Sequence, residues 1–356
     1  MKVLVTGCAG FIGSHVSEYL LKRNDIVIGI DNISDLYDIR QKKQNLEVLQ
    51  KYPKFLYFEE DITTTNLISE HQPDVVCHLA AYASVLHSIK NPKIYVKNNI
   101  NGTVNLLEQC KTTPQSKATP QSKNTPQSKT TPQSKPIKPI KFVYASSSSV
   151  YGTNTKVPFA ETDSLNNVNS PYAASKLSTE IYCNLYNKLY DIPVIGLRFF
   201  TVYGPRVRPN MATYKFLKAI HLGEKLTKFG DGTSSRDYTY IDDIVSGVIA
   251  SIDLPLTDDS STNTNPNTNT STCKIYNLGN NYTVTLNELI LTCEKVVGKK
   301  AQIEYLPNQK GDVPITWANI DLAKKELDYF PLISIEEGLR YTYEWIKQSV
   351  LSFRIR

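Results

Sequence analysis

Apolar residues along the chain fall into short runs, which alternate with longer segments that repeat apolar positions at helical spacing. The short runs predict β-strands at Lys2–Thr6, Ile26–Ile30, Phe55–Phe58, Val75–His78, Phe142–Ala145 and Val194–Phe200. The segments between them predict helices at about Phe11–Lys22, Arg40–Gln50, Ile94–Cys110 and Tyr172–Tyr190. Because strands that alternate with helices build a parallel sheet with crossover helices, the pattern predicts a doubly wound α/β fold.

The pattern becomes more mixed beyond about residue 196. There, loops and short strands surround helices that we expect at 213–222, 285–297 and 335–349. A chain of 356 residues is long enough for two or three compact units. We therefore expect a doubly wound domain over 1–195 and a smaller mixed α/β domain over most of 196–356.

Two segments of low complexity interrupt this pattern and are expected to be insertions, at 112–136 and 256–272. The first repeats Thr-Pro-Gln-Ser-Lys four times. Proline in every unit and the lack of apolar residues predict disorder for it. A stacked solenoid or a docking arm is the alternative, but units this short and polar cannot form a core.

The formal net charge of +6 belongs to one part of the chain. Residues 111–141 hold seven lysines and no acidic residue, which leaves 33 of the 40 basic residues against 34 acidic ones elsewhere, a net charge of −1. The charge of the predicted domains therefore does not indicate nucleic acid as a partner.

The six cysteines lie far apart and form no C-x-x-C pair, which argues against a zinc site and against a disulfide framework. We expect reduced, mostly buried thiols in a cytoplasmic protein, and no bound metal. No apolar run approaches the roughly 18 residues of a membrane span, and the first strand meets glycines too soon for a signal-peptide core. We expect no membrane contact.

Three glycines mark the junction of the first predicted strand and helix, in the stretch VLVTGCAGFIGSHV. The first permits a tight turn, the second lets a pyrophosphate approach the backbone, and the third lets the helix pack on the strand. Three glycines alone are a weak signal, but this position strengthens it. The cofactor contacts expected here are Gly7, Gly10, Phe11, Ile12 and Gly13.

The second predicted strand ends at Asp31, 18 residues after Gly13, and Asn32 follows it. A carboxylate there accepts hydrogen bonds from the adenosine ribose and repels a 2′-phosphate, which favours NAD over NADP. The alternative is that Asp31 only caps a turn.

The ends of the third and fourth strands supply further candidates for cofactor binding. Asp61 and Ile62 follow the third strand, where they are in position to meet the adenine. The fourth strand closes with small residues that let a cofactor pass close by, at Leu79, Ala80 and Ala81.

Tyr172 and Lys176 stand four residues apart on a predicted helix, so their side chains share one face. A phenol normally titrates near 10, and a nearby ammonium stabilises the phenolate and lowers that pKa. Such a tyrosine can take a proton from a sugar hydroxyl while hydride leaves the carbon beneath for a nicotinamide. The spacing alone arises by chance in many helices, but here it accompanies the glycine turn and a serine-rich strand end.

The chain resembles the extended short-chain dehydrogenase/reductase family of NAD-dependent sugar-nucleotide epimerases and dehydratases, over nearly its whole length apart from the two insertions. The shared stretches are T-G-x-x-G-F-I-G-S-H, D-N, H-L-A-A, N-x-x-G-T, S-S-V-Y-G, S-P-Y-x-x-S-K, R-F-F-T-V-Y-G-P and R-D-Y-T-Y-I-D-D. The resemblance implies a Rossmann domain, bound NAD with Asn99 among its contacts, and a substrate-binding second domain. It also implies catalysis by Ser147, Tyr172 and Lys176, with Tyr172 and Lys176 also among the cofactor contacts and Lys176 holding the phenolate and the ribose.

The serines of YASSSSVYG separate the reactions of this family. Dehydratases that resemble this segment carry Asp-Glu where this chain has Ser148 and Ser149, and decarboxylating relatives keep a glutamate at the second position. Without these carboxylates, neither elimination nor decarboxylation has its expected proton carrier. The sequence therefore favours epimerisation through a transient 4-keto sugar.

Four stretches together look most like UDP-glucuronate 4-epimerases, namely DNISDLYD, YASSSSVYG, LRFFTVYGPRVRPNMA and SSRDYTYIDDIV. In those enzymes the position of Thr201 holds threonine. Hydroxyl groups suit a sugar carboxylate, so Ser148, Ser149 and Thr201 are candidate contacts. Arg208 and Arg236 resemble residues that meet the diphosphate and uridine, and surface ion pairs are the alternative for both.

One stretch departs from the uronate pattern. Leu86 and His87 stand where A-G-V-R-Y-S would place arginine and tyrosine, and ASVLHS is similar to epimerases of neutral or N-acetylated UDP-hexoses. A lone histidine at a helix start is more often a surface residue than a substrate contact. A net reductase or 3,5-epimerase, and a non-catalytic dinucleotide-binding scaffold, remain rival hypotheses. Family members commonly pair through helices that correspond to 94–110 and 172–190, so we expect a homodimer.

Overall fold

The computed structural model describes residues 1–111, 139–256, 272–307 and 313–354, with side chains to residue 348. Its centre is a seven-stranded parallel sheet in the order β10-β6-β5-β4-β1-β2-β3. The strands are β1 (Lys2–Thr6), β2 (Ile26–Ile30), β3 (Phe55–Phe58), β4 (Val75–His78), β5 (Lys141–Ser147), β6 (Val194–Phe199) and β10 (Cys273–Leu278). The predicted doubly wound α/β fold is confirmed.

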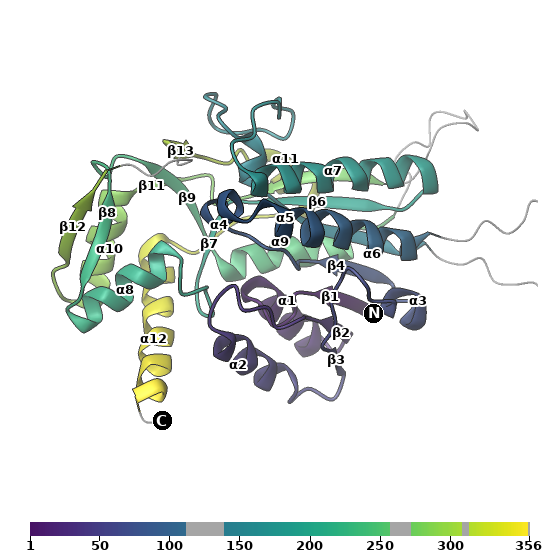
Figure 1. Ribbon diagram of the computed structural model, residues 1–356, viewed down its shortest axis with the longest axis horizontal. Coiled ribbons are helices and arrows are strands. Elements are labelled where there is room, and N and C mark those ends of the chain that lie inside the picture. The colour runs from purple at the N-terminus through teal and green to yellow at the C-terminus, as the bar shows by residue number, and fades with distance from the viewer. Residues whose placement is uncertain (112–138, 257–271, 308–312, 355–356) are drawn as a thin grey trace, which may run out of the picture.

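Helices cover both faces of this sheet (Figure 1). One face carries α1 (Phe11–Lys22), α2 (Ile39–Leu49) and α9 (Ile241–Asp253), and the other carries α3 (Leu67–His71), α4 (Val85–Lys90), α5 (Pro92–Tyr95), η1 (Val96–Asn101), α6 (Gly102–Cys110) and α7 (Pro171–Tyr190). Neighbouring strand residues divide between two separate apolar clusters: Val3 and Val5 belong to one, and Leu4 to the other. Because side chains alternate across a strand, the sheet is buried on both faces.

The predicted element bounds are largely confirmed. β1 to β4 and α1 begin and end at the predicted residues, and α7 begins one residue earlier, at Pro171. The predicted continuous helix Ile94–Cys110 is wrong in one respect, because the π-helical turn η1 separates α5 from α6. Asn98 and Asn99, both buried, lie in that turn.

The remaining elements form a smaller part beside the carboxyl ends of the sheet (Figure 1). Its strands are β7 (Thr201–Tyr203), β8 (Lys225–Phe229), β9 (Ser235–Tyr240), β11 (Thr283–Thr285), β12 (Gln302–Leu306) and β13 (Ile315–Thr316). Its helices are α8 (Ala212–Leu222), α10 (Leu286–Val297), α11 (Asp321–Leu327) and α12 (Ile335–Arg354). β9 pairs with β7, β11 and β13, and β8 pairs with β12.

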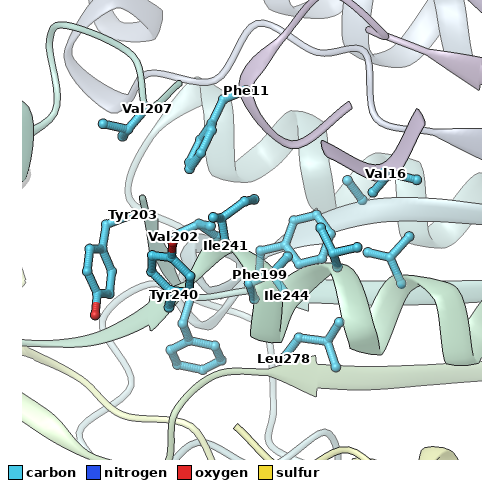
Figure 2. Close-up of a cluster of buried hydrophobic side chains, with 14 of the residues drawn as sticks. Phe11, Val16, Phe199, Val202, Tyr203, Val207, Tyr240, Ile241, Ile244 and Leu278 are labelled. Carbon is cyan, nitrogen blue, oxygen red and sulfur yellow. The ribbon is translucent and has the colours of Figure 1, made fainter. Parts of the chain in front are cut away.

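The two parts share a continuous apolar core (Figure 2). Phe11 of α1, Phe199 of β6 and Leu278 of β10 meet side chains of β7, α9 and the segment after β7, namely Val202, Tyr203, Ile241, Ile244 and Val207. The large sheet also runs across the predicted boundary at 195/196, because β10 and most of β6 lie beyond it. The division into two domains stays a prediction.

All six cysteines lie within the described residues and are free, and only Cys273 is exposed. No helix in the described ranges is both long enough and apolar enough to cross a bilayer. The same residues contain no group of three or more His, Cys, Asp or Glu side chains that could hold a metal ion. Almost all of both predicted insertions lies outside the described residues.

Candidate active site

A cavity of about 520 Å³ opens at the carboxyl ends of β1, β2, β4, β5 and β6. In doubly wound folds, ligands bind at this edge of the sheet. Most of the residues predicted from the sequence line it, namely Gly7, Gly10, Phe11, Ile12, Gly13, Asp31, Asn32, Ile62, Leu79, Ala80, Ala81, Ser147, Ser148, Ser149, Tyr172, Lys176, Thr201 and Arg208. Three are not among its lining residues: Asp61, Asn99 and Arg236.

The glycine turn is so closely packed that no side chain fits. Gly7 has φ +71°, and a Cβ placed on it would lie 2.9 Å from backbone atoms of Ala80. A Cβ on Gly13 would lie 2.1 Å from the carbonyl oxygen of Gly7. Gly10 precedes the first turn of α1, so free amides of that turn face the cavity. This geometry fits a pyrophosphate.

Asp31 is buried at the end of β2, and its carboxylate already has three donors. The backbone amides of Ala9 and Ile33 donate to it at 3.2 Å and 2.9 Å. The third donor is Lys42 of α2, whose Nζ lies 3.1 Å from Asp31 Oδ1 and 3.1 Å from Ser34 Oγ. Lys42 was not predicted from the sequence as a site residue. The available signal was its place on the apolar face of a predicted helix, where a lysine needs a partner.

Asp61 and Asn99 do not line the cavity, but their hydrogen bonds hold segments close to it. Asp61 Oδ1 accepts hydrogen bonds from the amide and the hydroxyl of Thr63, both at 2.8 Å, and so fixes the turn after β3. Asn99 accepts from the amide of Tyr82 at 2.9 Å and donates to its carbonyl at 3.0 Å. It also donates to Ser175 Oγ of α7 at 2.9 Å, so it ties the loop after β4 to α7.

Tyr172 stands in the first turn of α7, whose start is fixed by two local features. The Ser170 side chain accepts from the amide of Ala173 as an N-cap, and Pro171 occupies the first helical position. Burial raises the pKa of Tyr172, while a hydrogen bond with Ser147 and the charge of Arg208 lower it. Both groups that favour the phenolate line the cavity.

Lys176 is buried one turn further along α7. Its Nζ donates to the carbonyl oxygen of Ala145 at 2.7 Å. Burial lowers the pKa of Lys176 to about 8, and Cys183 and Glu180 partly oppose this. That its ammonium lowers the pKa of Tyr172 stays a prediction. The hydrogen bond to Ala145 directs the ammonium at the end of β5.

The serines at the end of β5 have different hydrogen-bond partners. Ser146 donates from Oγ to Glu180 Oε1 at 2.5 Å. Ser147, the last residue of β5, caps the turn η2 (Ser148–Tyr151) by accepting from the amide of Ser149 at 3.2 Å. Ser149 Oγ lies 3.2 Å from Ser147 Oγ. The strand end is therefore ordered by its own hydroxyls and lines the cavity.

The two predicted arginines differ in position. Arg208 lines the cavity and donates to the carbonyl oxygen of Ala83 at 2.6 Å, which ties the segment after β7 to the loop after β4. Arg236 of β9 donates instead to the carbonyl of its neighbour Ser235 at 2.9 Å and towards Pro314 at 3.5 Å. The structure therefore does not bring Arg236 to the cavity wall.

Leu86 and His87 take separate places in α4. Leu86 is 47 % exposed and lines the cavity. His87 lies 3.1 Å from the hydroxyl of Tyr95, which donates to the carbonyl of Ser84 at 2.9 Å, and its ring stacks on Tyr82. His87 is thus held in an aromatic cluster and is not a lining residue. Other lining residues that were not predicted from the sequence include Tyr37, Tyr82, Asn98, Phe200 and Met211.

The chain is similar to sugar-nucleotide enzymes over nearly all its length. Residues 4–342 match the family model described as GDP-mannose 4,6 dehydratase. UDP-glucuronate 4-epimerase of Thermodesulfobacterium geofontis is 40 % identical over 352 residues, which cover 98 % of this chain and 96 % of that protein. Protein CapI of Staphylococcus aureus is 38 % identical over 352 residues, covering 97 % and 98 %.

A solved structure of a sugar-nucleotide enzyme is also similar to this chain. The UDP-glucuronic acid 4-epimerase of Bacillus cereus, in complex with UDP-glucuronic acid and NAD, superposes with a TM-score of 0.82 at 36 % identity. The match covers 98 % of this chain and 100 % of that one.

Proposed function

Because the chain belongs to the extended short-chain dehydrogenase/reductase family of NAD-dependent sugar-nucleotide epimerases and dehydratases, we propose that it is an NAD-dependent 4-epimerase of a UDP-sugar. The proposed reaction interconverts UDP-glucuronate and UDP-galacturonate. The observation that carries the choice of reaction is the end of β5, where Ser148 and Ser149 line the cavity in place of carboxylates. Hydroxyl groups there cannot act as the acid and base of an elimination.

NAD fits the cradle formed by the glycine turn and Asp31, and it supplies the acceptor and donor of hydride. Tyr172 removes the proton from the C4 hydroxyl at its phenol oxygen, and Ser147 stabilises the phenolate through their hydrogen bond. Lys176 holds the end of β5 in place through Ala145. When the 4-keto sugar presents its other face, C4 takes back the hydride and Tyr172 returns the proton to the C4 oxygen, so no net redox change occurs.

We propose that the sugar carboxylate is bound by neutral hydroxyls. Ser148, Ser149 and Thr201 line the cavity, and none of them adds a charge that would draw the carboxylate towards loss of carbon dioxide. Arg208 is the candidate contact for the diphosphate. Arg236 stays a proposed contact for the uridine end, which requires its side chain to leave the carbonyl oxygens that it now contacts.

The position of Leu86 favours a second candidate for the substrate. An apolar side chain that lines the cavity in place of arginine suits a neutral or N-acetylated hexose better than a uronate. The second candidate is therefore 4-epimerisation of a UDP-hexose at the same site.

Three substrates separate these reactions. The purified protein is incubated with UDP-glucuronate, UDP-glucose or UDP-N-acetylglucosamine, without added NAD, and products are followed by proton NMR. We expect UDP-galacturonate from the first. Exclusive formation of a 6-deoxy-4-keto sugar or of a pentose would refute epimerisation, and product only from the other two substrates would select the second candidate. Tyr172→Phe should abolish turnover and still retain NAD.

We propose a homodimer that pairs through α7. Ile181, Leu185 and Leu189 lie at helical spacing on its exposed side, and 60 %, 42 % and 59 % of each is exposed. Leu185→Glu should shift the mass measured by light scattering from dimer to monomer, and an unchanged mass would refute this interface.

We also propose a cytoplasmic location, which suits the free cysteines, and two domains divided near residue 195.

A further inference from the structure

A buried cluster of three side chains joins β5, β6 and α7, and one of its members, Ser146, lines the cavity. We name it the Glu180 clamp, and its members are Ser146 of β5, Glu180 of α7 and Arg198 of β6. Ser146 Oγ donates to Glu180 Oε1 at 2.5 Å. Arg198 donates from Nε to Oε1 at 3.0 Å and from Nη2 to Oε2 at 2.8 Å. All three residues are less than 10 % exposed, so these bonds form in a dry environment.

The guanidinium of the clamp is itself held in place. Ser146 and Arg198 are direct neighbours in the pairing of β5 with β6. Arg198 Nη1 donates to the hydroxyl of Tyr151 at 2.9 Å, and that hydroxyl donates to Asn277 Oδ1 of β10 at 2.7 Å. The clamp therefore fixes Glu180 relative to three neighbouring strands of the sheet.

The clamp lies in line with the candidate catalytic groups of α7. Tyr172, Lys176 and Glu180 follow one another at intervals of four residues and so share one face of the helix. Each contacts a neighbouring residue at the end of β5: Tyr172 contacts Ser147, Lys176 contacts the Ala145 carbonyl, and Glu180 contacts Ser146. Of these three contacts, the clamp lies furthest from the start of α7.

We propose that Glu180, held by Ser146 and Arg198, is a positioning residue that fixes the end of β5 against α7 and so sets the contact between Ser147 and Tyr172. A buried ion pair adds little net stability, because both charges lose their hydration. What the bidentate pair supplies is a fixed direction and distance between helix and strand. The catalytic consequence rests on the proposed function, whereas the effect on the contact between Ser147 and Tyr172 does not.

Glu180 also places a negative charge one turn from Lys176. The titratable and charged groups that face these two residues are Cys183 of α7, Tyr144 of β5, Arg198 of β6 and His78 of β4. Glu180 raises the pKa of Lys176 against the effect of burial. Glu180→Gln should therefore move the loss of the Lys176 charge, and the alkaline limb of kcat, to lower pH. Ser146→Ala keeps the charge and should leave that limb in place.

The test follows Tyr172 directly in the NAD-loaded protein. Ring ¹³C NMR of labelled tyrosine, assigned with Tyr172→Phe, gives its ionisation midpoint in Ser146→Ala and Glu180→Gln. Ser147→Ala gives the midpoint without the hydrogen bond. Ser251→Ala is the matched control, because Ser251 is equally buried and donates only within α9, to the Gly247 carbonyl at 2.8 Å.

We expect the Tyr172 midpoint in Ser146→Ala and Glu180→Gln to rise towards that of Ser147→Ala. We also expect kcat to fall about tenfold with little change in KM, a fraction of what acid–base catalysis contributes. If both variants match Ser251→Ala in midpoint and kcat, the proposal is overturned. Should Glu180→Gln fail to fold, Ser146→Ala decides alone. If the wild-type protein epimerises no UDP-sugar, the proposed function fails, and the midpoints still decide the role of the clamp.

Discussion

His78 provides a quantitative prediction of how stability depends on pH. It lies at the end of β4, 2 % exposed, between the hydroxyls of Thr6 and Thr103. Thr6 Oγ1 accepts from the amides of Leu79 and Ala80, so its own proton goes to His78 Nδ1 at 2.8 Å. Nε2 then donates to Thr103 Oγ1 at 3.0 Å. Both ring nitrogens are satisfied only in the neutral imidazole.

Burial, together with the charge of Lys176, lowers the pKa of His78 from 6.5 to about 3. As pH falls below 6.5, His78 is therefore protonated in the unfolded chain but stays neutral in the folded chain. The free energy of unfolding decreases as pH falls from 6.5 towards 3. The full gap corresponds to roughly 5 kcal/mol, of which about 2 kcal/mol is lost between pH 7 and pH 5. Above pH 7 the group contributes no pH dependence.

Two measurements check this prediction. In ring ¹³C NMR of labelled histidine, the His78 signal should not titrate between pH 8 and pH 5. In urea unfolding, His78→Asn should be less stable than wild type at pH 7 and should lose about 2 kcal/mol less on transfer to pH 5. Thr103→Val keeps the histidine and should retain the wild-type slope. A His78 midpoint near 6.5, or equal slopes for wild type and His78→Asn, would refute the reasoning.

Three further substitutions test the cavity. Lys42→Met leaves Asp31 without its cation and should weaken NAD binding about tenfold, seen as a lower NAD content after purification. Gly13→Ala places a methyl group against the Gly7 carbonyl and should destabilise the protein by about 3 kcal/mol in thermal unfolding. Arg208→Met should raise KM for the UDP-sugar more than it lowers kcat, as measured by steady-state kinetics, because its charge faces the diphosphate in the proposed complex.

Patterns within short stretches of the sequence predicted several strands and one helix with their correct bounds. β1 to β4 and α1 have the predicted bounds because each is a short apolar run or a helical repeat next to a turn. The glycine turn was predicted for the same reason, since its three residues lie within seven positions of one another. The family resemblance, not periodicity, identified Ser147 and Thr201, both of which line the cavity.

Contacts between distant segments could not be predicted in this way. β10 follows a polar segment and joins the large sheet only by pairing with β6. Lys42 reaches Asp31 because α2 packs beside the end of β2, a geometry that no spacing in the sequence expresses. The contact of Arg236 with the Pro314 carbonyl also joins two distant segments, and the role of Arg236 at the substrate, which the resemblance implies, stays a prediction.

The four serines at 146–149 have different structural roles, although they are identical in the sequence. Identical residues have different roles because β5 ends within the run: Ser146 and Ser147 are still strand residues, and Ser148 and Ser149 begin the turn η2. A strand directs successive side chains to opposite faces, so Ser146 reaches Glu180 while Ser147 caps the turn. Because Ser147 is the last residue of the strand, its hydroxyl lies at the edge of the sheet, where it lines the cavity together with Tyr172. The register of β5 with β6, which the clamp holds, therefore determines which serine meets the tyrosine.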